Sequence, residues 1–341
     1  MVKILRWTRT LAALWLVLFL SACQLNAAIS PTETPTPTSI PTETPIPATP
    51  TPEPLRAIWV SADQGESAQQ VASVVQRLAE ETGLQFESIQ TLDVNQINDA
   101  MRVIIVKAPD MDMGVLASAH PAIQFVAITD ANLQSTANLS IINTNAKQIL
   151  FAGGYLSMIL SHDWRAVGLI AIDTPIGTDA AWAFFNGGGY FCGRCSPIVP
   201  PYVQFPLLVN LPAATDAAAW ENGYQAIESN LFNVAFIDGK ITNPEVYNRM
   251  AQRGLMLLGS GIPPAGLENV WAATIQEDIA GTLEKIWPDL AAGKSVGSLN
   301  AALQLTHVNA ALVGEGKIQA FDQMADELMQ GLISTDYQPL N

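Results

Sequence analysis

Short apolar runs alternate with amphipathic stretches along the chain from residue 55 onward. Two of these runs, residues 103–106 and 168–172, are apolar at every position, which is typical of strands covered by helices on both faces. Strands that alternate with helices form βαβ units and parallel sheets. The pattern therefore predicts an α/β fold.

The predicted strands fall into two series, which indicates two doubly wound, parallel-sheet lobes. The first series covers residues 56–61, 85–90, 102–107, 123–129 and 139–143, and the second covers 166–172, 205–211, 233–237, 255–258 and 270–273. The predicted helices cover residues 68–82, 148–161, 217–230, 244–253 and 276–290. We expect a first lobe over about residues 55–162 plus part of the C-terminal segment, and a second lobe over about residues 166–293.

The N-terminal segment has the layout of a secretory signal. Basic residues within the first nine positions precede the apolar run 11–20, which is shorter than the roughly 20 residues of a membrane-spanning helix. The run leads into Leu20-Ser21-Ala22-Cys23, which resembles the bacterial lipobox, where the cysteine is acylated and becomes the mature N-terminus. We expect a signal peptide over residues 1–22 and a lipoprotein that carries palmitate or a similar acyl group on Cys23. An ordinary signal with a coincidental cysteine is the alternative.

A proline- and threonine-rich stretch follows the predicted acylation site. Residues 31–54 contain nine prolines and eight threonines. Proline fixes φ and cannot continue a helix or a central strand, so such a stretch cannot pack a core. We therefore interpret residues 23–54 as a tether that holds residues 55–341 away from the extracytoplasmic face of the cell membrane.

Composition excludes two classes of protein. Of 341 residues, 49% are apolar and 14% are charged, so the chain can bury a large core and is not disordered as a whole. Its 31 acidic residues outnumber its 16 lysines and arginines, and no basic cluster occurs after the first nine residues. Because binding to nucleic acid requires clustered basic side chains, we expect no nucleic-acid partner.

Catalytic and metal-binding signatures are missing from the sequence. It contains no G-x-S-x-G, H-E-x-x-H, G-x-x-x-x-G-K-[ST] or G-x-G-x-x-G motif. His120, His162 and His307 lie far apart and show no metal-ligand spacing. We expect no enzyme activity, cofactor or metal, although an extracytoplasmic hydrolase built from residues that only folding brings together remains an alternative.

The two remaining cysteines stand close together, as Cys192-Gly193-Arg194-Cys195. In an exported protein this spacing favours a short structural disulfide. A thioredoxin-like redox pair would lie at a helix N-terminus, whereas this pair falls in a predicted glycine- and proline-rich loop, residues 187–201. A zinc site would need two further ligands nearby, and the sequence shows none.

The order of several segments resembles the basic membrane protein family, the PnrA-like purine nucleoside receptors of ABC importers. The resemblance covers most of residues 55–336. The segments that carry it are Pro121–Asp130, Phe151-Ala152-Gly153-Gly154, Ala166–Ile170 with Phe184-Phe185-Asn186-Gly187, and Thr274–Ala280 through Ala292-Gly293-Lys294. The resemblance implies a type I periplasmic-binding-protein fold, in which crossing strands join two lobes and the ligand occupies the cleft between them.

Three departures from the family fall where nucleoside contacts are expected. Ser61-Ala62-Asp63-Gln64-Gly65 stands in place of the family's Asp-Gly-Gly segment, and no Phe-Asn follows it. Gly259–Pro264 stands in place of the family's acidic strand end. The family's late-helix lysine falls at about Gln276 in this sequence. These changes remove two acids and a lysine from the ribose site that the resemblance implies.

Polar and aromatic residues after the predicted strands are the candidate ligand contacts, because ligands of open α/β sheets bind beyond the carboxyl ends of strands. Aromatic rings can stack on a flat ligand, and carboxylates can accept protons from hydroxyls or amines. Core packing is the alternative for the aromatic residues, and a turn or N-cap role is the alternative for the acids. The candidates are Asp63, Asp130, Trp182, Phe184, Asn186, Asp238 and Ser260.

These inferences lead to one expected function. We expect a lipid-anchored solute-binding protein that delivers a small polar ligand, nucleoside-like by the resemblance, to an ABC permease in the membrane. A lipoprotein of the same fold that senses a ligand and signals to a membrane partner is the alternative.

Overall fold

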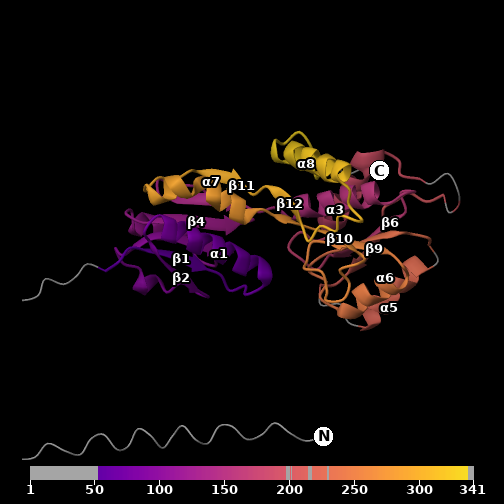
Figure 1. The fold of residues 1–341 in the computed structure, drawn as a ribbon, viewed down its shortest axis with the longest axis horizontal. Coiled ribbons are helices and arrows are strands. Elements are labelled where there is room, and N and C mark those ends of the chain that lie inside the picture. Colours follow the sequence, from indigo (N-terminus) through magenta and orange to yellow (C-terminus); the bar gives the residue numbers. More distant parts are fainter. Residues whose placement is uncertain (1–52, 197–199, 201, 214–216, 229, 337–341) are drawn as a thin grey trace, which may run out of the picture. The chain divides into compact units, whose positions relative to one another are not determined.

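The computed structural model describes residues 53–196, 200, 202–213, 217–228 and 230–336 (Figure 1). The predicted signal peptide, Cys23 and all but the last two residues of the predicted tether lie outside these residues. Two six-stranded sheets with helices on both faces make up the described part. Within that part, no helix has the length and apolar composition that crossing a membrane requires.

The first lobe is built on an entirely parallel sheet with the strand order β11-β5-β4-β3-β1-β2. Helices α1 and α7 bury apolar side chains against one face of the sheet, and α2 covers the other face together with Leu92 and Ile97, which flank the 3-10 helix η1. Its elements are β1 (Arg56–Val60), α1 (Glu66–Glu81), β2 (Gln85–Ile89), η1 (Val94–Gln96), β3 (Met101–Lys107), α2 (Met113–Ala119), β4 (Gln124–Thr129), β5 (Leu139–Asn143), α7 (Ile279–Ala291) and β11 (Ser298–Asn300).

The second lobe repeats this plan with the strand order β12-β10-β9-β8-β6-β7, in which only β12 runs antiparallel to its neighbour β10. Helices α3, α4 and α8 pack on one face of the sheet, and α5 and α6 pack on the other. Its elements are α3 (Ala146–Leu160), β6 (Ala166–Ala171), α4 (Asp179–Cys192), β7 (Leu207–Leu211), α5 (Ala217–Glu228), β8 (Val234–Ile237), α6 (Pro244–Gln252), β9 (Met256–Gly259), β10 (Trp271–Glu277), β12 (Leu303–Thr306) and α8 (Glu315–Met329).

The chain passes between the lobes three times, so the lobes are not continuous in sequence. The crossings follow β5, β10 and β11. As a result, the late helix α7 packs in the first lobe with α1, and the late strand β11 pairs there with β5 (Figure 1). The lobe boundaries therefore differ from those expected, because α3 packs into the core of the second lobe and α7 into the core of the first.

Every predicted strand overlaps an observed one, and the differences concern the later elements. The predicted helix 276–290 begins only at Ile279, because Gln276 and Glu277 belong to β10 and Asp278 caps the helix by accepting a hydrogen bond from the Gly281 N–H. Six elements were not predicted from the sequence, namely β11, β12, α2, α4, α8 and the 3-10 helix η1.

Helices α3 and α4 pack at backbone contact through glycine. A Cβ on Gly154 would lie 1.9 Å from the Phe184 carbonyl oxygen, and one on Gly187 would lie 1.8 Å from the Phe151 carbonyl oxygen. No side chain fits between the helices at these two positions. The contact holds α3 and α4 against β6 and β8, where Phe184 packs on the ring of Phe236 at a centroid distance of 5.1 Å.

The structure joins Cys192 and Cys195 in a disulfide, with their Cα atoms 5.4 Å apart. The predicted loop over residues 187–201 differs at its start, because α4 continues to Cys192. Gly193 ends the helix with φ 64°, a left-handed conformation that glycine adopts without strain. The disulfide thus fastens the end of α4 to the segment that leads to β7.

Candidate ligand-binding site

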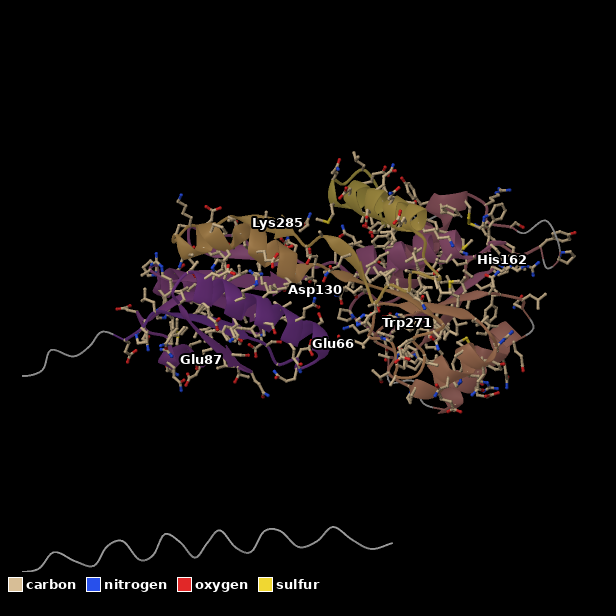
Figure 2. The ribbon with its side chains drawn as sticks, viewed as in Figure 1. Glu66, Glu87, Asp130, His162, Trp271 and Lys285 are labelled. Carbon is tan, nitrogen blue, oxygen red and sulfur yellow. A yellow bond between two sulfur atoms is a disulfide. The ribbon has the colours of Figure 1, made fainter. Side chains whose placement is uncertain are left out.

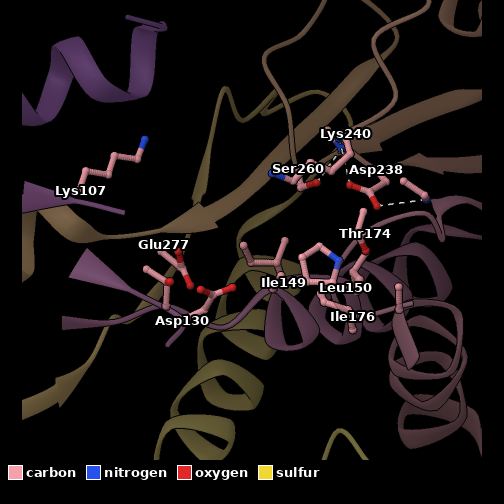
Figure 3. Close-up of a pocket in the computed structure, with 16 residues that line it drawn as sticks. Lys107, Asp130, Ile149, Leu150, Thr174, Ile176, Asp238, Lys240, Ser260 and Glu277 are labelled. Atoms are coloured by element: carbon pink, nitrogen blue, oxygen red, sulfur yellow. Dashed lines mark hydrogen bonds between the residues drawn. The ribbon is translucent and has the colours of Figure 1, made fainter. Parts of the chain in front are cut away.

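A pocket of about 490 Å³ lies between the two lobes, in the size range typical of small-molecule sites (Figure 3). Glu66 and Asp130 both lie at the end of the first lobe that faces the second (Figure 2). The pocket is lined by Lys107, Asp130, Thr144, Ala146, Ile149, Leu150, Ala171, Thr174, Pro175, Ile176, Ala180, Asp238, Gly239, Lys240, Ser260 and Glu277.

Sheet topology explains the position of the pocket. In each lobe the strand order reverses once, between β1 and β3 in the first lobe and between β6 and β8 in the second. Ligands of doubly wound sheets bind beyond the carboxyl ends of the strands at such a switch point. Lys107 ends β3, whereas Thr174 and Asp238 follow β6 and β8. The pocket therefore lies between the switch points of the two lobes.

Asp238 is buried and held by several hydrogen bonds. Its carboxylate accepts the backbone N–H groups of Ala171 and Lys240 at 3.2 and 3.1 Å. Burial raises the pKa of Asp238, and the two backbone hydrogen bonds and one with Ser260 oppose that rise. Ser260 also accepts the Gly239 N–H at 2.8 Å. This network fixes the loops after β8 and β9 at the second-lobe side of the pocket.

Two carboxylates face the first-lobe side of the pocket. Glu277 ends β10, and its Oε1 atom accepts the Asn145 N–H at 2.5 Å. Burial is the main cause that raises the pKa of Glu277 to about 7, and the negative charge of Asp130 adds to it, while the Asn145 hydrogen bond opposes the rise. A carboxylate in this setting exchanges its proton near neutral pH.

Two lysines also line the pocket, and they differ in their partners. Lys107 forms an ion pair with Asp63, with 2.7 Å between Nζ and Oδ2. The hydrogen bond from Lys107 is the main cause that lowers the pKa of Asp63, and the Gly65 N–H lowers it further. Lys240 is exposed, and its side chain forms no hydrogen bond or ion pair with any residue that the structure describes.

The remaining lining is mostly aliphatic. Ile149 and Leu150 from α3 and Ile176 from the segment after β6 supply it. Among the described residues of the lining, none is aromatic. The hydroxyl oxygen of Thr174 is buried there and has no hydrogen-bond partner in the described structure.

The structure brings together some of the predicted site residues and places the others elsewhere. Asp130, Asp238 and Ser260 line the pocket. Asp63 does not line it but contacts Lys107, which does. Its carboxylate also accepts the Gly65 N–H, so Asp63 has the turn role considered as the alternative.

The three predicted contacts on α4 do not line the pocket. Trp182 is 38% exposed and meets Phe185 edge-on at a centroid distance of 6.1 Å. Phe184 is wholly buried in the core of the second lobe, which was the alternative interpretation. Asn186 is buried and donates a hydrogen bond to the Thr335 carbonyl oxygen at 3.1 Å. These positions remove the aromatic rings on which stacking with a flat ligand was expected.

Sequence reasoning missed five polar residues of the pocket, namely Lys107, Thr144, Thr174, Lys240 and Glu277. Lys107 could have been found, because it is the polar residue that directly follows the apolar run 103–106. Glu277 was not identified because its segment was interpreted as a helix, whereas the residue ends strand β10. No group of three or more histidines, cysteines, aspartates and glutamates within the described residues could hold a metal ion.

No family model matches the chain, and no curated protein matches its sequence. Several solved structures are similar at low identity. An ABC transporter solute-binding protein from Conexibacter woesei is 14% identical, with a TM-score of 0.61, over 82% of this chain and 98% of that protein. Another from Aeropyrum pernix K1 is 13% identical, with a TM-score of 0.50, over 83% of this chain and 88% of that protein.

A protein titled as a transcriptional activator of the comK gene, from Bacillus halodurans, is also similar. It is 11% identical, with a TM-score of 0.55, over 82% of this chain and 99% of that protein. Likeness at this level of identity establishes the fold and leaves function to the site. Together with the two parallel-dominated sheets, it shows that this chain has the α/β fold of type I periplasmic binding proteins.

Proposed function

We propose that this protein is an extracytoplasmic, lipid-anchored solute-binding protein that delivers a small polar ligand to an ABC permease. The observation that carries the proposal is the pocket, which lies between the switch points of two lobes and combines charged groups with an aliphatic lining. Solute-binding proteins of ABC transporters from two other organisms share the fold. The predicted signal and lipobox supply the export and the anchor.

Binding without catalysis fits the chemistry of the pocket. The hydrogen bonds of Asp238 and Ser260 hold the surrounding loops, so these two groups are engaged in structure. The described part of the lining contains neither histidine nor cysteine, the side chains most often used as general base and thiol nucleophile. We infer a binding protein rather than an enzyme.

A nucleoside is the ligand class suggested by the resemblance to the basic membrane protein family. The carboxylates of Asp130 and Glu277 could accept hydrogen bonds from ribose hydroxyls. The aliphatic lining offers no ring for base stacking, which distinguishes this pocket from the site that the sequence suggested. Nucleosides are therefore the first class to test within the proposed function.

Sensing is a second candidate function, because a protein titled as a transcriptional activator shares the fold. In that case the closed, ligand-bound form would contact a signalling partner in the membrane. Neighbouring genes for a permease and an ATPase would favour transport, and a neighbouring sensor kinase gene would favour sensing.

The first test is a search for a co-purified ligand by native mass spectrometry, followed by thermal unfolding with that ligand. At 100 times the dissociation constant, a ligand that binds only the folded protein stabilises it by about 2.7 kcal/mol, which raises Tm. Asp130→Ala should reduce the rise in Tm, because the Asp130 side chain lines the pocket and makes no hydrogen bond within the described structure.

Trp182→Ala is the matched control for this test, since Trp182 lies outside the pocket lining. It should respond to the ligand as the wild type does. Loss of the response in Trp182→Ala, or an unchanged response in Asp130→Ala, would contradict the assignment of the pocket.

A second test concerns the anchor. Cys23→Ala should yield an uncleaved or unacylated protein without changing the fold of residues 55–341, because the cysteine precedes these residues in the sequence. Intact-mass analysis of membrane and soluble fractions measures this. Wild-type protein found in the soluble fraction without added acyl mass would show that Cys23 is not an anchor.

A further inference from the structure

The polar groups of the pocket form two separate sets (Figure 3). The carboxylates of Asp130 and Glu277 lie together on one side, whereas Thr174, Asp238, Lys240 and Ser260 gather on the other. Ile149 lies between the two sets, so a ligand that contacts both must lie over an aliphatic surface. The first set is called the acidic end below, and the second is called the far end.

The acidic end carries negative charge that the described structure does not neutralise. The Asp130 side chain forms no hydrogen bond or ion pair with the described residues, and Glu277 uses only Oε1, for the Asn145 N–H. Lys107 is the nearby cation, but it already forms an ion pair with Asp63, with 2.7 Å between Nζ and Oδ2. A ligand that carries a cation at this end would therefore offset the repulsion between the exposed Asp130 carboxylate and the desolvated Glu277 carboxylate.

The far end presents groups that suit an oxygen atom of a ligand. Asp238 has both carboxylate oxygens engaged by backbone N–H groups. The buried Thr174 hydroxyl has no partner in the described structure, and the Lys240 ammonium at the rim has none either. The Lys240 ammonium can therefore donate a hydrogen bond to a ligand oxygen, whereas the Thr174 hydroxyl oxygen is shielded from the pocket.

An organic cation fits the acidic end better than a metal ion. Calcium needs six to eight oxygen ligands, and the described residues contain no group of three acids or other metal-binding side chains in one place. A protonated amine carries three N–H donors, which two carboxylates can accept.

We propose that the pocket binds a non-aromatic ligand whose protonated amine lies between Asp130 and Glu277 and whose hydroxyl or carboxylate oxygen reaches Lys240. The proposal rests on the proposed function in one respect only, namely that the pocket takes a small molecule. The proposal adds a ligand class, because the acidic end requires a positive charge on the ligand and the far end requires an oxygen atom.

Three pairs of compounds that differ in a positively charged nitrogen group test the ligand class by isothermal titration calorimetry. The pairs are 4-amino-1-butanol and 1,4-butanediol, 3-amino-1,2-propanediol and glycerol, and glucosamine and glucose, with adenosine and inosine as neutral ring compounds. In at least one pair, the charged member should bind at least about tenfold more tightly than its neutral partner, as one charge-assisted contact provides.

Glu277→Gln tests the position of the amine. The amide oxygen can still accept the Asn145 N–H, so the variant keeps the local fold and loses only the charge. Binding of the charged compound should weaken at least about tenfold. Glu80→Gln, an exposed glutamate of α1, is the matched control and should bind as the wild type does.

The pH dependence of binding provides a readout that a merely structural role would not give. An amine prefers ionised Glu277, whose pKa is about 7, so wild-type affinity should rise about tenfold from pH 6 to pH 8. The charged groups that face Glu277 are Asp130 and Lys107, with Asp238 and Lys240 on the opposite side of the pocket. In Glu277→Gln this rise should disappear.

The outcomes distinguish a failure of the amine proposal from a failure of the proposed solute-binding function. If neutral compounds bind and no charged member does, the amine proposal is overturned and the solute-binding function stands. Equal binding of an amine by Glu277→Gln and wild type overturns the placement between Asp130 and Glu277. If no compound binds and no ligand co-purifies, both the amine proposal and the proposed function fail.

Discussion

Gly187→Ala is expected to lower the free energy of unfolding by about 3–5 kcal/mol, the range of the most damaging single substitutions. The added Cβ would lie 1.8 Å from the Phe151 carbonyl oxygen, whereas carbon and oxygen approach to about 3.3 Å at the closest. The obstacle is backbone of α3, so no rotamer change relieves it. Helices α3 and α4 would have to separate, which opens the buried contact between them.

Gly189→Ala in the same helix is the matched control. A Cβ at Gly189 meets no atom within 4 Å, so the substitution adds no clash. Alanine favours the helix over glycine by about 1 kcal/mol, and the variant should be slightly more stable than the wild type. Urea unfolding followed by circular dichroism measures both variants. Equal midpoints for Gly187→Ala and wild type would show that α3 and α4 are not in backbone contact.

The glycine contact also matters for the pocket. Helix α3 contributes Ile149 and Leu150 to the lining, and α4 contributes Ala180. These residues lie near the start of their helices, so the spacing of the helices fixes the aliphatic surface over which a ligand would lie. A partly folded Gly187→Ala protein should therefore also lose the ligand-induced rise in Tm.

The pattern of apolar runs predicted the sheets because burial on both faces leaves a strong signal. Strands such as β3 and β6 are almost wholly buried, and residues 103–106 and 166–171 within them are continuous apolar runs. The short strands β11 and β12 have no such run, since much of their surface remains accessible. Their places are determined by pairing with β5 and β10, which the local sequence does not encode.

Helix α4 was missed for a different reason. Its three consecutive glycines, residues 187–189, disfavour a helix by about 1 kcal/mol each relative to alanine and are typical of a loop. Tertiary packing overrides that preference. Glycine is the only residue type that permits the contact with α3 at position 187, because any Cβ there would clash with the backbone of α3. Once the segment is helical, Phe184 points into the core, and the expected aromatic contact with a ligand is lost.

The pocket could be predicted only in part, because its charged residues come from distant parts of the chain. Asp130, Asp238 and Ser260 follow predicted strands, and the rule for doubly wound sheets identifies them. Glu277 reaches the same pocket through a crossing between lobes. Its neighbour Asn145 lies at another crossing, and nothing in the local sequence pairs the two.

Glu277→Gln is expected to stabilise the ligand-free protein at high pH and to have little effect at low pH. The ordinary pKa of a glutamate side chain is 4.5, and burial in the folded protein raises the pKa of Glu277 to about 7. The folded state therefore binds this proton more tightly than the unfolded state does. The contribution of Glu277 to stability is largest below the unfolded pKa and is lost as the pH rises from about 4.5 to 7.

Glutamine carries no charge at any pH, so it avoids this loss. Since a tenfold change in proton affinity corresponds to about 1.4 kcal/mol, Glu277→Gln should gain about 2 kcal/mol over the wild type between pH 5 and pH 8. Urea unfolding across this range measures the gain, and Glu80→Gln should show none because it is exposed. A constant difference between Glu277→Gln and wild type would show that Glu277 ionises normally.

The same substitution should therefore stabilise the empty protein and weaken its binding of an amine. A charged group that is held at a cost in the free protein and neutralised by the ligand contributes more to affinity than one already paired. Glu277 is such a group, because it lies near the negative charge of Asp130 while the nearby Lys107 is already paired with Asp63. Opposite signs for the two effects in one variant would be difficult to obtain from a glutamate with a purely structural role.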